Sequence, residues 1–247
     1  MKRIIAIIPA RMGSSRFPGK PMALINNMPM IGHVYEAVSA CKDIEKTIVA
    51  TCDLEIFEYI ESIGGQAVMT KNTHDRASDR CAEALLILEK EESRKYDIVV
   101  MVQGDEPMTV PEMISESITP MLDDSSILVT NLISDIDSYD EFIDKNCIKV
   151  VCDLNQNAVY FSREAIPTLS KSNSVQMKKQ VCIIPFKRDF LLEYTNLSET
   201  PLEIAESIDM LRVIEHGYKV RMVQTSYKTF AVDTPEDLKK VESLLKK

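Results

Sequence analysis

Histidine is scarce in this sequence, and this limits the chemistry that the chain can support. Only three histidines occur among 247 residues, and two of them, His33 and His216, lie in no motif. His74 precedes a helix-like segment, where a capping or surface role fits it as well as a catalytic one. Histidine is the side chain used most often in general acid–base catalysis. We therefore expect no histidine base, and no other general base is assigned.

Cysteine motifs and long apolar runs are missing as well. The six cysteines include no CxxC pair and no combined Cys/His spacing of a metal site. They fall in apolar or helix-like stretches, as small buried side chains do in a reducing compartment. The apolar run at residues 4–8 is too short for a secretory signal, and nothing reaches transmembrane length. A cytoplasmic location without a membrane partner is predicted.

The charge of the chain is unevenly distributed. The formal net charge is −9, and no broad basic stripe is present. Because binding to nucleic acid depends on many phosphate contacts, no nucleic-acid partner is expected. The first 20 residues are an exception, since they contain five basic residues and no acidic one. Such a local cluster is compatible with a small phosphorylated ligand.

What is present is the composition of an ordinary globular protein, with 45% apolar and 27% charged residues. The length suits one α/β domain with an embellishment. Strand-like and helix-like runs alternate, which is typical of a mostly parallel sheet flanked by helices. The expected strands are residues 4–8, 47–50, 67–70 and 98–102, and the expected helices are residues 30–40, 55–63, 78–92 and 111–121.

From about residue 126 the pattern changes to shorter strands. These are expected at residues 127–131, 148–152 and 159–161, followed in the tail by a helix at 201–216, a strand at 220–224 and a helix at 235–245. We expect a single domain over residues 1–247 with a small inserted mixed α/β lobe at about 126–195, for acceptor binding or dimerisation. The apolar residues at 126–165 are consistent with a dimer face or with a second core.

The loop after the first expected strand, residues 9–20, reads PARMGSSRFPGK. Ligands of open α/β sheets bind beyond the carboxyl ends of the strands, and glycines let the backbone turn sharply there. Arg11, Arg16 and Lys20 can surround a polyphosphate. The spacing matches neither the Walker A pattern nor the GxGxxG of a dinucleotide site. A polyphosphate-binding loop of another kind is therefore predicted.

Two aspartates at loop positions are candidate metal ligands. Asp105 follows the apolar strand at 98–102, where an aspartate can form a turn or hold a hard cation beside a phosphate. Asp233 precedes Thr234 and a proline-led acidic turn, which fit the start of a helix. The helix start explains residues 234–237 but not Asp233, so a cap and a second metal ligand both stay open.

Three motifs occur in order along the chain: PARMGSSRFPGKP, VQGDEP and VDTPEDL. Together they resemble the 3-deoxy-manno-octulosonate cytidylyltransferase family, which makes the CMP-activated sugar acid of lipopolysaccharide, and the similarity runs over nearly the whole chain. The resemblance implies an α/β, Rossmann-like nucleotide-diphospho-sugar transferase fold and a homodimer. It also implies Mg²⁺-dependent transfer of CMP from CTP to a small acidic acceptor, with release of pyrophosphate.

The resemblance further implies roles for individual residues. Asp105 and Asp233 would hold Mg²⁺, and the expected catalytic residues are these two together with Arg11, Arg16 and Lys20. The residues expected at the nucleotide are Pro9, Ala10, Arg11, Ser15, Arg16, Lys20, Thr51, His74, Ser78, Arg80 and Gln103. In the segment HDRASDR, Arg76 and Ala77 replace the small Ser and Gly of the family pattern.

The acceptor side departs from the family. The residues expected to bind the acceptor are Gln103, Arg163, Gln180 and Asp209. Gln180 stands where the family has a histidine, and Asp209 shortens an acid of the family's EQLR motif. A sugar hydroxyl without its partner costs about 1–3 kcal/mol, so several such losses can abolish recognition. The expected acceptor is the octulosonate or a modified form of it, and the alternative is another acidic sugar, a phosphonate or a phosphate ester.

The expected reaction is in-line attack of an acceptor oxygen on the α-phosphorus of CTP. Cations would hold both reactants and neutralise the phosphates. Two rival classes remain as alternatives. A dehydrogenase requires the GxGxxG that is missing, and a non-catalytic nucleotide-binding protein would tolerate loss of Asp105 or Asp233, yet both are present.

Overall fold

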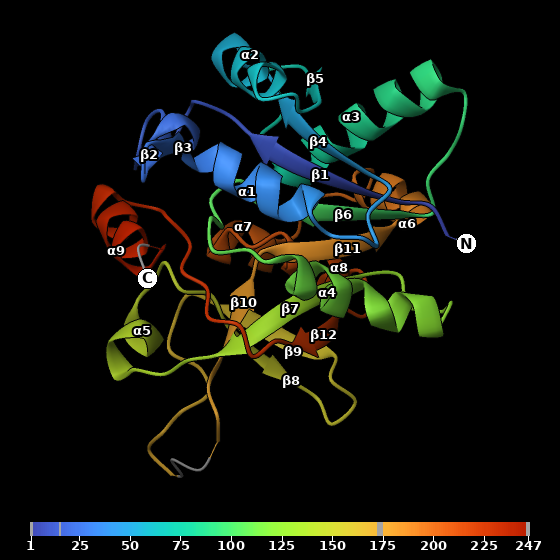
Figure 1. Cartoon of the computed structure of the whole chain (residues 1–247). Helices are drawn as coiled ribbons and strands as arrows, with labels where there is room; N and C mark the ends of the chain where they lie inside the picture. The colour runs from blue at the N-terminus through green and yellow to red at the C-terminus, as the bar shows by residue number, and fades with distance from the viewer. Residues whose placement is uncertain (1, 15, 172–174, 246–247) are drawn as a thin grey trace.

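A parallel-rich sheet forms the centre of the computed structural model, which describes residues 2–14, 16–171 and 175–245 (Figure 1). Its strand order is β11–β6–β1–β4–β5, in which only β11 runs antiparallel to its neighbour. The strands are β1 (Ile4–Ala10), β4 (Lys46–Thr51), β5 (Ala67–Met69), β6 (Ile98–Val102) and β11 (Ile183–Lys187). The four strands expected in the first half of the chain are confirmed.

The continuous apolar run of β1 reflects burial on both faces of this sheet. All residues of β1 are buried. Ile5 and Ile7 belong to the core on the side of α3 (Ala77–Glu92), whereas Ile4 and Ile8 belong to the core on the side of α1 (Met30–Ser39) and α4 (Pro111–Asp123). Full burial of such a side chain contributes about 1.5–3 kcal/mol. This is why β1 reads as a hydrophobic run and not as an alternating pattern.

Most of the helices lie where the sequence predicts them (Figure 1). They are α1 (Met30–Ser39), α2 (Leu54–Ser62), α3 (Ala77–Glu92), α4 (Pro111–Asp123), α5 (Tyr139–Ile143), α6 (Arg188–Tyr194), α7 (Pro201–Glu206), α8 (Met210–Glu215) and α9 (Pro235–Leu245), with a short 3₁₀ helix η1 (Lys20–Met22). In the described part of the chain, no helix combines the length and the hydropathy needed to cross a membrane.

A second sheet lies below the first in Figure 1 and is mainly antiparallel, with the order β12–β7–β10–β8–β9. Its strands are β7 (Thr130–Asp135), β8 (Lys149–Cys152), β9 (Ala158–Ser162), β10 (Lys178–Val181) and β12 (Arg221–Gln224). The segment 126–195 thus supplies β7–β10 to this sheet but β11 to the central one. A bridge between Val129 and Phe186 joins the two sheets.

Two expected elements differ in the structure. The expected strand at 127–131 begins later, at Thr130. The single helix expected at 201–216 is wrong, because α7 and α8 are separate helices and Ser207 between them has a left-handed φ of 54°. The guanidinium of Arg163 donates to the carbonyls of Glu206 (2.7 Å) and Ser207 (3.3 Å), which fixes this break. The break leaves Asp209 at the start of α8 instead of inside a helix.

The C-terminal segment returns to the N-terminal half of the fold. Helix α9 lies beside a small hairpin of β2 (Leu24–Ile25) and β3 (Met28–Pro29), as Figure 1 shows. Val232 and Val241 pack with Ile25 and Met30 in a separate small core. This packing carries Asp233 back to the loop that follows β1.

Candidate active site

The ammonium of Lys20 lies between the two aspartates that the sequence predicts as metal ligands. Its Nζ is 2.7 Å from Asp105 Oδ2 and 3.3 Å from Asp233 Oδ1. Gly19 precedes it with a φ of 73°, in the left-handed region that favours glycine, and its amide donates to the carbonyl of Met12 (3.0 Å). This closed turn directs Lys20 back across the end of β1. Three residues far apart in the sequence therefore meet in one place.

Backbone packing places the two aspartates. Asp105 follows β6, which lies next to β1 in the sheet. Gly104 allows the loop after β6 to lie close to the end of β1, because a Cβ at this position would lie 3.1 Å from Ile31 Cδ1 and 3.2 Å from the carbonyl oxygen of Pro9. The amide of Val232 donates to the carbonyl of Asp105 (2.9 Å), so the loop before α9 is tied directly to the loop after β6.

The helix start that the sequence predicts at residues 234–237 is present, and Asp233 takes no part in it through its side chain. Asp237 Oδ2 accepts hydrogen bonds from the amides of Asp233 (3.1 Å) and Thr234 (2.9 Å). The carboxylate of Asp233 instead faces Lys20 and Arg16, with Arg16 NH2 at 3.0 Å. The cap therefore leaves this carboxylate available for cations.

Two cations, Lys20 and Arg16, face two carboxylates, Asp105 and Asp233, so the charges of this centre balance. Burial alone would lower the pKa of the Lys20 ammonium, but the charges and hydrogen bonds of Asp105 and Asp233 outweigh burial and raise it. Arg16 adds a second cation, and its NH1 donates to Asn146 Oδ1 at 2.5 Å. Lys20 is thus held fully charged, as a phosphate-binding cation must be.

A cavity of about 170 Å³ opens beside this centre. Its lining combines the ends of β1 and β6 with the loop before α3: Pro9, Ala10, Arg11, His74, Asp75, Arg76, Ala77, Arg80 and Gln103. Six of the residues predicted to contact the nucleotide are in this lining. Arg80 is buried, and its NH1 donates to Thr70 Oγ1 (2.5 Å). Within the described residues its NH2 has no hydrogen-bond partner, so it is a donor available to a ligand.

Thr51 and Ser78, which are also predicted at the nucleotide, do not line this cavity. Thr51 ends β4 and is fully buried, and Ser78 is fully buried in the first turn of α3. His74 Nε2 lies 2.5 Å from Glu83 Oε2, while its carbonyl accepts from Arg11 NH1 (3.4 Å). Ser15 lies outside the described residues.

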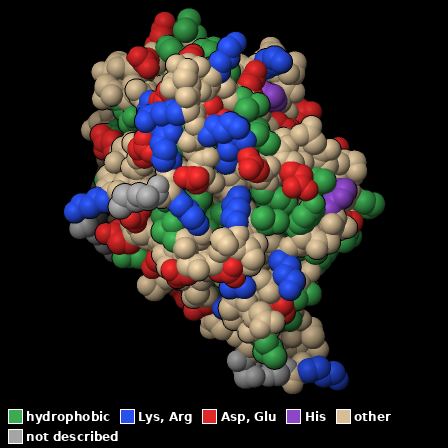
Figure 2. Space-filling model, turned by 90° about the vertical axis from the view of Figure 1, so that its right-hand side faces the viewer, with side chains coloured by type: hydrophobic (Ala, Val, Ile, Leu, Met, Phe, Trp, Pro, Cys, Tyr) green, Lys and Arg blue, Asp and Glu red, His purple; other side chains and the backbone are tan. Residues whose placement is uncertain are grey.

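A larger hollow of about 780 Å³ runs along α3 and α6 and shares His74 with the smaller cavity. Arg11, Arg80 and Gln103, which line the smaller cavity, do not line this one. The smaller cavity lies where ligands of open α/β sheets bind, at the carboxyl ends of β1 and β6, and it is the better candidate for the substrate site. On the face drawn in Figure 2, basic side chains lie among acidic ones and form no continuous stripe.

The residues predicted to bind the acceptor have different surroundings. Gln180 Nε2 donates to Asn131 Oδ1 (2.6 Å) on the neighbouring strand. The guanidinium of Arg163 is bonded to backbone carbonyls, including that of Lys145 (3.0 Å), besides the two carbonyls at the α7–α8 break. Gln103 lines the cavity. Asp209 belongs to a cluster of charges on the far side of Arg76.

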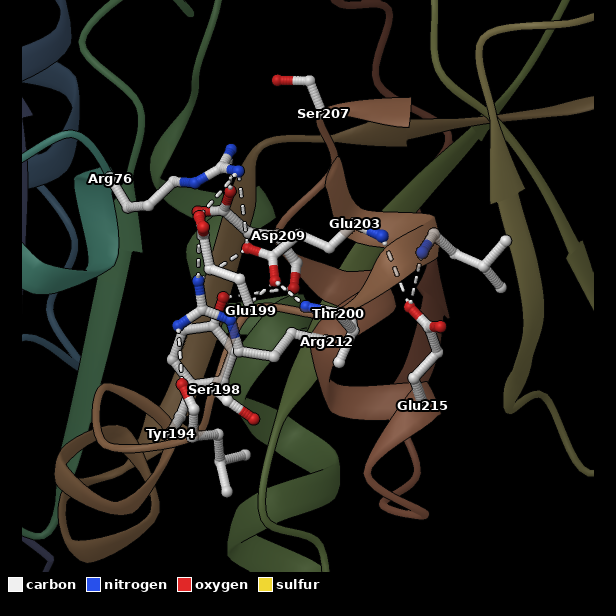
Figure 3. A network of polar contacts seen from close by, with 12 residues as sticks. Arg76, Tyr194, Ser198, Glu199, Thr200, Glu203, Ser207, Asp209, Arg212 and Glu215 are labelled. Atoms are coloured by element: carbon white, nitrogen blue, oxygen red, sulfur yellow. Dashed lines mark hydrogen bonds and ion pairs between the residues drawn. The ribbon is translucent and has the colours of Figure 1, made fainter. Parts of the chain in front are cut away.

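This cluster consists of Arg76, Glu199, Glu203, Asp209 and Arg212, and we call it the arginine–carboxylate cluster (Figure 3). Arg212 donates twice to Glu203, at 2.7 Å each, and both side chains are nearly inaccessible. Arg76 comes from the loop before α3 and reaches Asp209 Oδ1 (3.2 Å) and Glu199 Oε1 (3.4 Å). Burial raises the pKa of Asp209, and the charge of Arg76 opposes this shift.

Several residues of the site escaped the sequence reasoning. Asn146, which holds Arg16, lies in no motif. Arg76 stood out only as a departure from the family pattern, and Glu203 gave no signal because its partner Arg212 lies nine residues away. Glu106 is buried behind Asp105, and its burial, followed by the charge of Asp105, raises the pKa of its carboxyl to about 7.

Comparison with known proteins agrees with this geometry. A family model described as cytidylyltransferase matches residues 5–244. The 3-deoxy-manno-octulosonate cytidylyltransferase of Geobacter metallireducens is 41% identical over 97% of this chain and 96% of its own length. That of Syntrophus aciditrophicus is 42% identical over 99% of this chain and 98% of its own.

Solved structures agree as well. CMP:2-keto-3-deoxy-manno-octonic acid synthetase complexed with CTP has a TM-score of 0.89 at 36% identity, over 99% of both chains. A cytidylyltransferase from Leptospira borgpetersenii, at 16% identity and a TM-score of 0.65 over 100% of this chain and 87% of its own, shares the fold alone.

The fold and the site together define a nucleotidyltransferase built on a Rossmann-like sheet. The chain belongs to the cytidylyltransferase family, and within it to the 3-deoxy-manno-octulosonate cytidylyltransferases. The family resemblance, the α/β fold class and the enzyme class predicted from the sequence, a CTP-dependent nucleotidyltransferase, are confirmed.

Proposed function

We propose that the chain transfers CMP from CTP to 3-deoxy-manno-octulosonate, or to a modified form of it, and releases pyrophosphate. The observation that carries this proposal is the convergence of Lys20 and Arg16 on Asp105 and Asp233 beside the cavity at the ends of β1 and β6. The names of the full-length relatives supply the acceptor. We also propose that the chain is cytoplasmic and forms a homodimer. Light scattering of the purified protein tests the dimer.

The residues of this chain would act mainly by binding and orienting. Arg11 and the free NH2 of Arg80 line the cavity, where they can pair with phosphate oxygens. Lys20 and Arg16 would stabilise the negative charge that develops on the leaving pyrophosphate. Gln103 lies in the same lining and would contact the acceptor beside the nucleotide. Placing both reactants in line supplies much of the rate enhancement in such reactions.

A magnesium ion fits the donor set at this centre. Asp105 and Asp233 already share one cation, the Lys20 ammonium, so their carboxylates face a common point. Among the described residues, no three His, Cys, Asp or Glu side chains gather as a complete metal site. Mg²⁺ commonly uses one or two carboxylates and takes its other ligands from phosphates and water. When bound, it would neutralise phosphate charge and make the acceptor oxygen more acidic.

A different small acidic acceptor is the second candidate, and a specific observation favours it. Gln180 and Arg163, two of the predicted acceptor ligands, are engaged in hydrogen bonds within the protein. Recognition would then depend on the remaining groups, Gln103 and Asp209. Another acidic sugar, a phosphonate or a phosphate ester would still use the same nucleotide half.

The test is pyrophosphate release from CTP with and without Mg²⁺, against octulosonate, its terminal amino analogue, other acidic sugars and small phosphonates. Turnover with octulosonate or its amino analogue supports the proposal. Turnover only with another acid keeps cytidylyl transfer but replaces the acceptor. CTP binding without turnover of any acceptor would leave a non-catalytic nucleotide-binding protein. Activity that is unchanged after chelation of Mg²⁺ would remove the metal from the proposal.

A further inference from the structure

Arg76 joins the two halves of the site. Its backbone belongs to the loop before α3, which lines the cavity at the nucleotide side. Its guanidinium reaches Asp209 at the start of α8 and Glu199 before α7, on the acceptor side (Figure 3). The side chain is only 20% exposed, so these ion pairs are partly shielded from water. Arg76 is therefore one wall of the cavity and a fixed partner of an acceptor-side carboxylate.

The arginine–carboxylate cluster has no cation left for an anionic ligand. Arg212 is committed to Glu203 by two hydrogen bonds. Arg76 is shared by Asp209, Glu199 and, at 3.6 Å, Glu203. Three carboxylates thus face two guanidinium groups. A second acidic group on a ligand would meet net negative charge here.

Asp209 offers an acceptor atom that this cluster leaves open. Its carboxylate does not cap α8, and its Oδ1 accepts from Arg76. In the described part of the chain, its Oδ2 has no hydrogen-bond partner. The Asp209 side chain is 20% exposed, and its partner Arg76 lines the cavity, so this ion pair links Asp209 to the cavity wall.

We propose that Arg76 is a specificity-determining residue that holds Asp209 as a hydrogen-bond acceptor for a hydroxyl or amino group at the far end of the acceptor substrate. The inference rests on the proposed function and deepens it. The substrate class is a sugar acid whose only anionic group lies near the reacting oxygen. The same acid with a phosphate ester at its far end is rejected.

The experiment compares wild type with Arg76→Ser, Arg76→Lys and the matched control Arg94→Ser. Arg94 also pairs with two carboxylates, Glu45 and Glu92, but lies outside the site. Pyrophosphate release is measured with octulosonate, its terminal amino analogue and its terminal phosphate ester, and KM is obtained separately for CTP and acceptor. Thermal unfolding shows whether each variant is folded.

Wild type should use the phosphate ester at least about 100-fold less efficiently than the best uncharged-end acceptor. Arg76→Ser should raise KM for that acceptor about tenfold, as expected for loss of one well-held charged hydrogen bond, and leave KM for CTP within about twofold. Arg76→Lys should recover part of the loss, and Arg94→Ser should change neither KM.

Equal changes in both KM values, or none, would overturn the assignment while wild-type turnover leaves the proposed function standing. Efficient use of the phosphate ester by wild type would overturn it as well. A wild-type enzyme that turns over no acceptor would overturn the proposed function, and the inference with it.

Discussion

Lys149 is the buried cation whose replacement should have the largest structural effect. It has no accessible surface, and its Nζ donates to the carbonyls of Asp144 (2.7 Å), Cys147 (2.6 Å) and Arg163 (2.6 Å). Burial lowers the pKa of its ammonium. These three bonds tie the loop that carries Asn146, the partner of Arg16, to the end of β9.

Replacement of Lys149 by Met keeps the bulk but removes every donor. Each carbonyl left buried without a partner costs about 1–3 kcal/mol, and relief from burying the ammonium offsets part of the sum. We expect a loss of about 3–5 kcal/mol in the free energy of unfolding, which for a chain of this size lowers Tm by about 10 °C. Because the loop also positions Arg16, KM for CTP should rise several-fold.

Urea denaturation, calorimetry and CTP kinetics check this expectation, with Lys42→Met as the control because Lys42 is exposed. A Lys149→Met protein within about 1 kcal/mol of wild type would refute the reasoning, since it would mean that water or loop movement satisfies the three carbonyls. A large loss of stability with an unchanged KM for CTP would refute only the link to Arg16.

Three further expectations concern other charges. Asp105→Asn or Asp233→Asn should lower kcat/KM by about 10²–10³ with little change in Tm, because each removes electrostatic stabilisation of the reaction. Kinetics and thermal melts check this, and a decrease in kcat/KM of less than tenfold would contradict the predicted role. Glu203→Gln should lower the free energy of unfolding by about 3–5 kcal/mol, because the buried Arg212 would keep only the more distant Glu199, at 3.8 Å, as a charged partner. Denaturation at neutral pH measures it, and a change below about 1 kcal/mol would argue against a buried ion pair. Burial alone would raise the pKa of Glu92, but hydrogen bonds from Arg94, Lys46 and Tyr96 lower it from 4.5 to about 2, so its contribution is present above pH 4.5 and is lost as the pH falls toward 2. Glu92→Gln should therefore make unfolding less dependent on acid over that interval, which urea titrations at several pH values test; identical acid profiles would count against it.

Most of the local structure of the central sheet was predictable from the sequence. The buried strands β1 and β6 read as uninterrupted apolar runs because helices cover both faces of the sheet. The α7–α8 break was not predictable, because it depends on hydrogen bonds from Arg163, more than 40 residues earlier. The helix propensities of residues 201–216 do not depend on such a distant contact and could not predict the break.

The sequence by itself determined the family and the class of reaction, and it singled out six of the residues that line the cavity at the ends of β1 and β6. These residues lie in short motifs next to buried strands. Apolar runs and turn residues can be recognised there because they depend only on residues that are close in the sequence. Only the tertiary structure decided that Lys20 lies between Asp105 and Asp233, and that Arg76 reaches Asp209. Those pairs are separated by 85, 213 and 133 positions. Ion pairs depend on distance in space, and the packing of the two sheets and of α9 sets that distance.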